Sequence, residues 1–167
     1  MVRRTQITRQ IAELEALYKQ QFPAFARVAI SLTGSVELGK EAVQEAFARA
    51  IEQAESFRGD CPLEAWVWRI VVNTARTSAR RAAYEDGDGA VDLEPEKANG
   101  HTDLPVVQLW VRALPERQRA VVFLRYWADL DYRSIAEALE IEVGTVSATL
   151  NAAHSSLRRL LQEEVPK

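Results

Sequence analysis

The sequence predicts an all-α fold made of two small helical domains joined by an acidic, flexible linker, the second of them a helix-turn-helix domain. Hydrophobic residues make up 47% of the 167 residues and recur at helical spacing along most of the chain. Six prolines and seven glycines are too few for the many turns of a β-sandwich or barrel. Near the middle, the helical spacing is lost. We place the first domain at residues 1–82, the linker at 83–103 and the second domain at 104–167.

The helical pattern begins near the N-terminus. The first apolar stripe consists of Ile7, Ile11, Leu14, Leu17 and Tyr18. Pro23 is expected in the first turn of a second helix, where a missing backbone N–H costs no hydrogen bond. Gly34 is expected to end that helix in a left-handed conformation, and Ser35 to cap the next helix.

The third helix is expected to extend to about Ser56 and to have two unlike faces. Its buried stripe consists of Val43, Ala46, Phe47, Ala50 and Ala54. Its outer face carries Glu37, Glu41, Gln44, Glu45 and Glu52. A charged outer face is usually only solvated, but this face could also dock a basic partner.

A stiff polar loop at 57–61 and a helix over 62–82 follow. On a helical wheel, the apolar side of this helix carries Leu63, Val67, Ile70 and Thr74, and a separate polar stripe carries Arg69, Asn73, Arg76 and Arg80. Trp66 lies at the seam and Trp68 on a further face, so the two tryptophans are not expected to share one core. Aromatic rings, an amide and arginines suit unstacked bases and phosphates. A solvated basic face over a tryptophan-rich core is the alternative.

The segment 83–103 lacks helical periodicity. It contains seven acidic residues against Lys97 alone, together with glycine and proline. With few apolar side chains to bury, it cannot offset the entropy cost of ordering. We therefore interpret it as an acidic linker.

The second domain is predicted to contain four helices, over Leu104–Leu114, from Pro115 onward, over Tyr132–Leu139 and over Val143–Glu163. The last helix is expected to bury Val146, Leu150, Ala153, Leu157, Leu160 and Leu161. Ala136 and Val146 have helix-turn-helix spacing, which makes the last helix a candidate for reading a DNA major groove. Glu140 stands where the turn usually needs a left-handed residue, at a cost of about 1 kcal/mol. An ordinary helical hairpin is the alternative.

The outer positions of the last helix carry polar side chains, namely Thr145, Ser147, Asn151, His154, Arg158 and Arg159, with Ala148 among them. No lysine or arginine occurs between Arg133 and Arg158. Such a helix can read base edges through hydroxyl and amide groups, but it gains little from phosphates.

Composition and residue pattern argue against several classes of protein. The net charge of −3 argues mildly against autonomous binding to duplex DNA. No window is long and apolar enough to span a membrane, and no secretory signal is evident. The single cysteine, Cys61, permits no intramolecular disulfide, which fits a reducing cytoplasm. His101 and His154 lack metal-ligating neighbours. No catalytic constellation, metal or cofactor is expected, and Asp129 and Asp131 are interpreted as helix caps.

The order of these features resembles a sigma-70 family sigma factor of bacterial RNA polymerase, of the small two-domain extracytoplasmic-function (ECF) type. The residues similar to the family's core-polymerase-binding motif are 41–47. Those similar to its promoter-melting and minus-ten segment are 57–60, 66–70 and 73–75. Those similar to its minus-thirty-five domain are 114–119, 132–136 and 143–146.

The resemblance implies a bacterial transcription initiation factor whose partners are core RNA polymerase, promoter DNA and an anti-sigma factor or other regulator. Core-polymerase binding would fall to Glu41, Gln44 and Glu45. Minus-ten recognition and melting would fall to Phe57, Arg58, Asp60, Trp66, Trp68, Arg69, Asn73, Arg76 and Arg80. Minus-thirty-five recognition would fall to Arg133, Thr145, Ser147, Asn151, His154 and Arg158.

The chain departs from the family pattern at Lys40, where an acidic residue is common, at Glu140, where glycine is usual, and at 147–149, where basic residues are common. A sigma factor borrows affinity from polymerase, so the isolated protein is expected to bind duplex promoter weakly. The alternatives are a free-standing helix-turn-helix regulator and a sigma-like interaction protein without promoter-opening activity.

Overall fold

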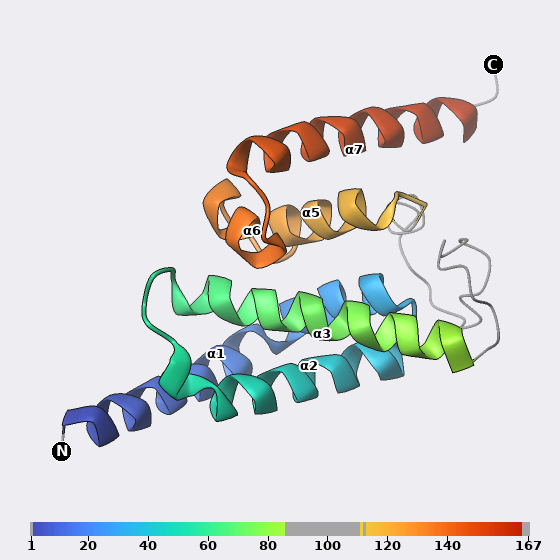
Figure 1. Ribbon diagram of the computed structural model, residues 1–167. Helices are drawn as coiled ribbons and strands as arrows, with labels where there is room; N and C mark the ends of the chain where they lie inside the picture. The colour runs from blue at the N-terminus through green and yellow to red at the C-terminus, as the bar shows by residue number, and fades with distance from the viewer. Residues whose placement is uncertain (1, 86–110, 112, 165–167) are drawn as a thin grey trace.

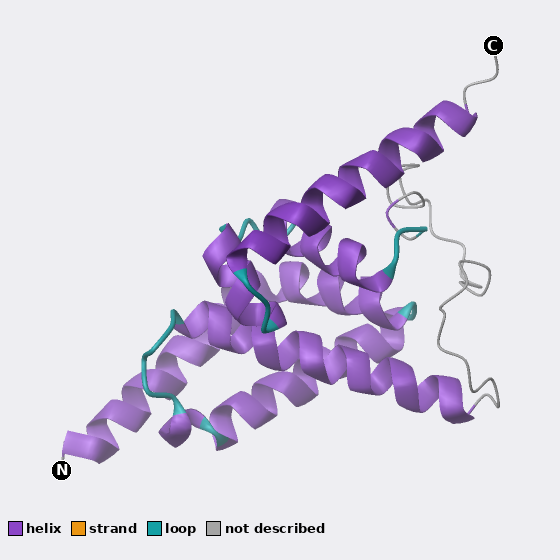
Figure 2. Ribbon diagram, turned by 45° about the horizontal axis from the view of Figure 1, so that its top comes forward, coloured by secondary structure: helices purple, strands orange, loops and turns teal. Residues whose placement is uncertain are grey.

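All regular structure in the described part of the chain is helical, as the sequence predicted (Figures 1 and 2). The computed structural model describes residues 2–85, 111 and 113–164. Its helices are α1 (Val2–Thr33), α2 (Val36–Glu52), the 3-10 turn η1 (Ala54–Ser56), α3 (Leu63–Glu85), α5 (Glu116–Tyr126), α6 (Tyr132–Leu139) and α7 (Val143–Glu164).

Helix α1 continues through Pro23, so the predicted start of a second helix at this residue is wrong. A proline inside a helix removes a hydrogen bond and crowds the preceding turn, at a cost of about 3 kcal/mol. Packing on both sides offsets this cost. The rings of Tyr18 and Phe25 lie edge-on to Phe47 of α2, with centroids 4.9 and 5.1 Å away. Both halves of α1 are thereby held against the same neighbour.

The connection between α1 and α2 has the predicted chemistry. Gly34 ends α1 with a φ of 72°, and the hydroxyl of Ser35 accepts a hydrogen bond from the N–H of Leu38 at 3.3 Å. At Gly39 the two helices approach so closely that an added Cβ would lie 2.7 Å from the backbone nitrogen of Ile30. The predicted apolar face of α2 is buried, but the helix ends at Glu52 and the rest of the segment forms η1.

Both tryptophans of α3 are buried in one core, which contradicts the prediction that they could not share it. The ring of Trp68 lies 4.2 Å from that of Phe25, and the ring of Trp66 lies 5.1 Å from that of Phe57. The prediction failed because it allowed α3 only one buried side. The helix contacts α1, α2 and α6, so several of its faces are covered.

The predicted helix-turn-helix is present in α6 and α7. Asp131 caps α6 by accepting a hydrogen bond from the N–H of Ser134 at 2.7 Å. Glu140 adopts the predicted left-handed conformation, with φ 54° and ψ 47°. After it, the N–H of Ile141 donates to the carbonyl of Ala136 at 3.0 Å, and α7 packs back through the buried Val146.

Two smaller predictions for this domain are wrong. Asp129 is not a cap; it has a φ of 54°, and its carboxylate lies 3.9 Å from the guanidinium of Arg125. Leu161 is 42% exposed rather than buried, because α7 runs on beyond its main core contacts at Leu150 and Ala153 (Figure 1).

The two domains pack directly against each other (Figures 1 and 2). Helix α3 contacts α6, α1 contacts α5, and buried residues of both domains form one core cluster. Helix α3 extends to Glu85, three residues into the predicted linker. The rest of that linker, and most of the helix predicted over 104–114, lie outside the described residues.

Candidate nucleic-acid interface

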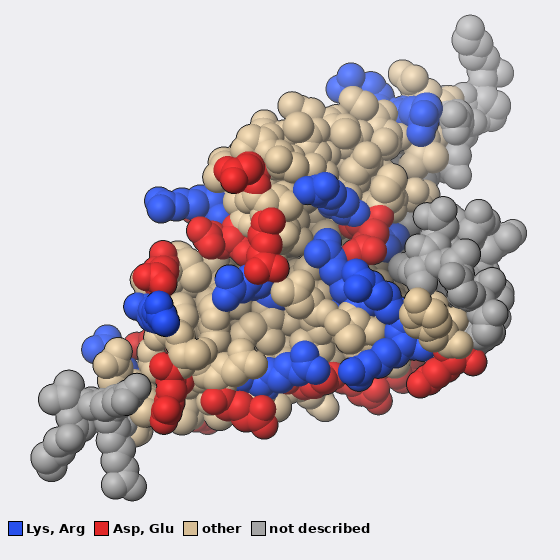
Figure 3. Space-filling view, in the orientation of Figure 1, with Lys and Arg blue, Asp and Glu red and all other residues tan. Residues whose placement is uncertain are grey.

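The polar stripe predicted on α3 is only partly open to solvent. Asn73 and Arg80 are exposed, whereas Arg69 and Arg76 are half-buried. Figure 3 shows basic side chains gathered over α3 in a band that meets acidic side chains of the second domain. The stripe therefore contains free positions and positions that already face carboxylates.

Arg76 forms the closest ion pair between the domains within the described residues. Its Nε donates to Oε1 of Glu116, in the first turn of α5, at 2.6 Å, and its side chain is 23% exposed. Two turns earlier on α3, Nη1 of Arg69 lies 4.0 Å from Oε1 of Glu140. Charge-assisted bonds to a guanidinium are stronger than neutral hydrogen bonds, and partial burial reduces their screening.

An open pocket of about 570 Å³ lies where α3 meets the helix-turn-helix. Arg69, Arg117 and Arg133 contribute three positive charges to its wall, and Glu137, Glu140 and Glu142 contribute three negative charges. Charged residues of this pocket affect the pKa of the nearby Cys61 thiol. Burial raises the pKa of its thiol, the carboxylate of Glu137 adds to the rise, and Arg69 opposes it. The thiol therefore stays protonated at neutral pH, which argues against a reactive cysteine.

In the loop before α3, the polar residues are exposed to solvent and the aromatic residue is half-buried. Arg58 and Asp60 are exposed on either side of Gly59, which has a φ of 78°. Phe57 is half-buried against Trp66. Because Trp66 is 6% exposed and Trp68 is 0% exposed, neither ring presents a free face for a base in this conformation. Of the predicted minus-ten set, Arg58, Asp60, Asn73 and Arg80 are exposed, Arg69 and Arg76 are half-buried, and both tryptophans are buried.

The predicted acidic face of α2 is accessible. Glu41 and Gln44 are exposed, and Glu45 is half-buried beside Arg49, to which it is ion-paired. The opposite face of α2 packs into the core through Ala42, Val43 and other apolar residues. The side chains predicted to dock polymerase thus lie on one surface of the first domain.

Helix α7 presents the predicted polar residues on its outer side. Asn151, His154 and Arg158 are exposed, and Thr145 and Ser147 are half-buried; Arg133 of α6 is exposed as well. Nε2 of His154 lies 2.9 Å from the hydroxyl of Tyr126 on α5. Tyr126 itself is 57% exposed. The contact between His154 and Tyr126 joins α7 to α5.

Glu116 and Tyr126 contact predicted site residues but were not predicted as site residues themselves, although Glu116 lies in the motif 114–119. Each contacts a predicted site residue from another helix, 40 and 28 positions away in the chain. Periodicity carries no information about such distant pairs. Within the described residues, no group of three or more metal-ligating side chains occurs. No helix in this part of the chain is long and apolar enough to cross a membrane.

The comparisons with known proteins agree with this arrangement. The family model described as Sigma-70 region 2 matches residues 17–84, and the model described as Sigma-70, region 4 matches residues 107–157. The RNA polymerase sigma-H factor of Pseudomonas aeruginosa is 31% identical over 140 residues, covering 74% of this chain and 72% of that protein. The chain belongs to the sigma-70 family.

Other relatives have the same character. The ECF RNA polymerase sigma factor EcfG of Rhodopseudomonas palustris is 30% identical, covering 83% of this chain and 80% of that protein. The ECF RNA polymerase sigma-E factor of Escherichia coli is 31% identical, covering 73% of each. As an ECF sigma factor, the protein acts in transcription initiation by binding core RNA polymerase and directing it to promoters.

Solved structures show the same fold. The sigma factor RpoE of Bartonella quintana, in complex with the anti-sigma factor NepR, superposes with a TM-score of 0.72 at 24% identity, covering 92% of this chain and 99% of that one. CnrH, in complex with the cytosolic domain of CnrY, gives a TM-score of 0.72 at 21% identity, covering 99% and 100%.

Proposed function

We propose that the α3 stripe with its preceding loop recognises and opens the minus-ten element, and that the outer face of α2 docks on core polymerase. The observation that carries this proposal is the division of the first domain into two unlike surfaces. One surface is acidic and lies on α2, where Glu41 and Gln44 are exposed. The other is polar and basic and lies on α3, where Asn73 and Arg80 are exposed. A protein surface and a nucleic-acid surface are thus separate.

Asn73 is the residue best placed to hold an unstacked base. It is exposed on α3, it lies between the two half-buried arginines of the stripe, and its amide can both donate to and accept from a base edge. Arg80 would contact phosphates. Trp66 and Trp68 would support this surface from beneath, since their rings lie in the core.

The second domain would read the minus-thirty-five element through α7. Its outer residues can contact base edges, but few basic groups flank them, so polymerase has to supply much of the affinity. A helix-turn-helix regulator acting alone would need a more basic reading helix. A non-enzymatic role in the cytoplasm is consistent with these surfaces. Two of the structural neighbours were solved with regulators, one named an anti-sigma factor, and a comparable regulator is proposed for this chain.

Run-off transcription with core polymerase tests the proposal. Asn73→Ala should abolish most open-complex formation while leaving polymerase binding intact, because its exposed amide lies on α3 and not on the proposed docking face of α2. Glu41→Lys with Glu45→Lys should weaken polymerase binding at least tenfold, through charge reversal on the docking face.

The matched control is Glu13→Lys with Glu15→Lys, the same double charge reversal at exposed residues of α1, whose ion-pair partners are Arg9 and Lys19. This variant should behave as the wild type. If the double reversal on α2 leaves polymerase binding unchanged, the docking face lies elsewhere. Normal open complexes from Asn73→Ala would contradict the assignment of that residue.

A further inference from the structure

We propose that Arg80, Arg81 and Tyr84 form a phosphate clamp that holds the double-stranded DNA beside the melted minus-ten element. The inference rests on the function proposed above, in which the loop before α3 and Asn73 open that element. It adds a second DNA contact at the opposite end of α3, and it gives a role to Tyr84, which was predicted to lie in the linker. The ligand is the sugar-phosphate backbone, so this contact carries no base specificity.

Tyr84 is more exposed than any other large hydrophobic side chain in the described part of the chain. It is 74% exposed, whereas the other aromatic residues of α3, Trp66 and Trp68, are 6% and 0% exposed. Its ring therefore packs on little of the protein, and its hydroxyl is accessible to a ligand from solvent. A tyrosine hydroxyl is one of the side-chain groups that donate to phosphate oxygens in protein–DNA complexes.

Helical register places Tyr84 on the same stripe as the exposed residues proposed to contact DNA. At about 100° per residue, Arg80 lies about 20° to one side of Asn73, and Tyr84 lies about 20° to the other. Glu85 lies about 100° farther round the helix than Tyr84, so its carboxylate falls off the stripe. The stripe thus continues without an acidic residue into the last turn of α3.

Two arginines lie next to Tyr84 on the helix surface. Arg80 and Arg81 precede it by four and three residues, the spacings at which helical side chains are neighbours. Both are exposed, and neither forms an ion pair with a described residue. Two guanidinium groups and a hydroxyl are therefore available together as donors. A phosphate offers only acceptor oxygens and one negative charge, which suits this set.

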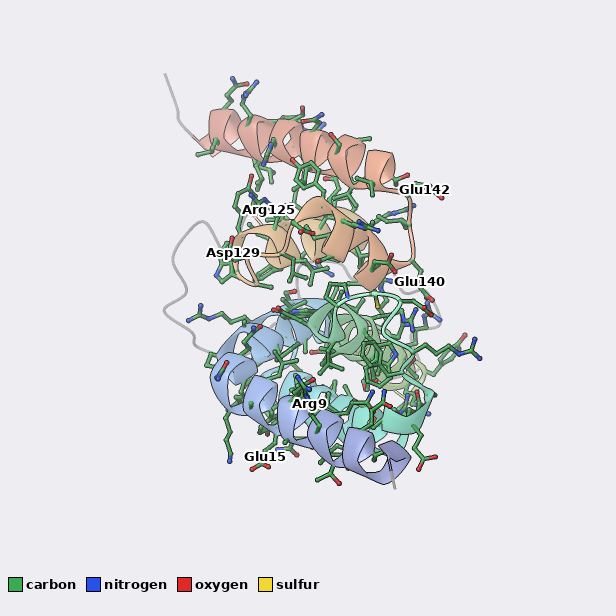
Figure 4. All side chains as sticks on the ribbon, turned by 90° about the vertical axis from the view of Figure 1, so that its left-hand side faces the viewer. Arg9, Glu15, Arg125, Asp129, Glu140 and Glu142 are labelled. Carbon is green, nitrogen blue, oxygen red and sulfur yellow. The ribbon has the colours of Figure 1, made fainter. Side chains whose placement is uncertain are left out.

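The earlier arginines of the stripe have a different environment, since each faces a carboxylate of the second domain. Arg69 lies 4.0 Å from Glu140, and Arg76 lies 2.6 Å from Glu116. Figure 4 shows Glu140 at the boundary between the domains. The phosphate clamp lies beyond both ion pairs along α3, and its three side chains are exposed in the structure as it stands.

The length of α3 determines where on the DNA the phosphate clamp would act. Tyr84 follows Asn73 by eleven residues, which corresponds to about 16 Å along the helix. Phosphates of one B-DNA strand recur about every 3.4 Å along the axis, so the clamp would act about five phosphates from the base held by Asn73. The loop with Arg58 and Asp60 lies at the other end of α3. Because that loop would hold the melted bases, the clamp is expected on the side that stays double-stranded.

Binding of the holoenzyme to a forked DNA tests the hydroxyl of Tyr84. The probe derives from a promoter selected from a random-sequence library by transcription with wild-type holoenzyme. It carries a single-stranded minus-ten element and about ten base pairs of adjoining duplex, twice the span estimated above, without a minus-thirty-five element. Tyr84→Phe removes only the hydroxyl and should bind about threefold to tenfold less tightly. Tyr132→Phe, at an exposed tyrosine of α6, is the matched control and should bind as the wild type.

A methylphosphonate scan of the same probe identifies the phosphate. Each substitution removes the charge of one phosphate, and wild-type binding should weaken most at a duplex position about five phosphates from the base held by Asn73. At that position, Tyr84→Phe should cause no further loss, because both changes remove the same contact. Additive losses at every position of the scan would overturn the proposed contact.

The salt dependence of binding tests the two arginines. Arg80→Gln and Arg81→Gln should each reduce the slope of log K against log salt concentration by about 1, because each removes one phosphate contact. Arg27→Gln, at an exposed arginine of α1, is the matched control and should leave the slope unchanged. Unchanged slopes in both α3 variants, or an equal reduction in the control, would overturn the phosphate clamp.

Failure of the phosphate clamp can be told apart from failure of the function on which it rests. If Asn73→Ala abolishes promoter opening while the Tyr84, Arg80 and Arg81 variants bind as the wild type, the proposed function stands and the clamp is overturned. If Asn73→Ala opens the promoter normally while the three clamp variants bind weakly, the clamp stands and the role proposed for Asn73 is wrong.

Discussion

The left-handed backbone of Glu140 is unfavourable for a glutamate, whereas its side chain forms an ion pair between the two domains. Its left-handed backbone costs about 1–2 kcal/mol relative to glycine, because the Cβ crowds the following carbonyl oxygen. The ion pair with Arg69 that the side chain gains is long and more than one-third exposed. Such pairs contribute at most about 1 kcal/mol. The residue is therefore not optimal for local stability.

We accordingly expect Glu140→Gly to raise the free energy of unfolding by about 1 kcal/mol in high salt, where the ion pair to Arg69 is screened. Urea unfolding measures the change. The control is Glu137→Gly, an exposed position inside α6, which should lower stability by about 0.5–1 kcal/mol. A loss of stability at both positions would show that the turn at Glu140 is unstrained.

Gly39 tests the opposite requirement, the absence of a side chain. In Gly39→Ala, the new methyl group would meet the backbone of Ile30. We expect a loss of about 1–3 kcal/mol from overpacking, although alanine is the better helix former. Gly144→Ala is the matched control, since open space surrounds that helical glycine, and it should be neutral or stabilising by up to about 1 kcal/mol. Thermal unfolding compares the two variants.

Helix α1 illustrates, at the scale of an element, how tertiary packing overrides a local breaker. Pro23 is exposed, so its ring contributes little to the core. We expect Pro23→Ala to stabilise the protein by about 2 kcal/mol, as a regained helical hydrogen bond outweighs the greater freedom of the unfolded chain. Calorimetry or thermal unfolding checks this. An unchanged or lower melting temperature would mean that the helix has fully adapted to the proline.

Helix α6 depends on its cap in a pH-dependent way. Hydrogen bonds from the backbone and side chain of Ser134 lower the pKa of the Asp131 carboxyl, against a small opposing effect of burial. A lowered pKa in the folded state means that the stabilisation is present at neutral pH and is lost as the pH falls through the acidic range below about 4. Asp131→Ala should cost about 1 kcal/mol at pH 7 and much less in acid.

Asp131→Ser is the matched control for this cap, since a serine hydroxyl can accept the same hydrogen bond without titrating. It should retain most of the stability at pH 7 and show no added loss in acid. Unfolding curves recorded for both variants across the acidic range make the comparison. A pH-independent loss for Asp131→Ala would show that the carboxylate form is not what stabilises α6.

At the scale of the whole molecule, the sequence predicted those structural features that depend on residues close together in the chain. The caps at Ser35 and Asp131, the left-handed turn at Glu140 and the helix-turn-helix follow from local chemistry. The family followed from three ordered motifs. The partnership of Arg76 with Glu116, and the shared core of the tryptophans, depend instead on segments brought together by folding. A wheel drawn for an isolated helix cannot show that α3 is covered on several sides.

The continuous core leads to one further prediction at this scale. Because buried residues of both domains form one cluster, the full chain should unfold in a single cooperative transition, rather than in two. Calorimetric and van't Hoff enthalpies should therefore agree. Two resolved transitions in the wild type would mean that the domains are energetically independent. In Glu116→Arg, the transitions should begin to separate, while in Glu142→Gln they should remain as one.

The contact of α3 with α6 also makes the molecule sensitive to temperature. Separating the domains would expose apolar surface that the shared core now removes from water, so opening carries a positive change in heat capacity. Apolar association of this kind weakens on cooling. Cooling is therefore expected to weaken the packing of the second domain against α3.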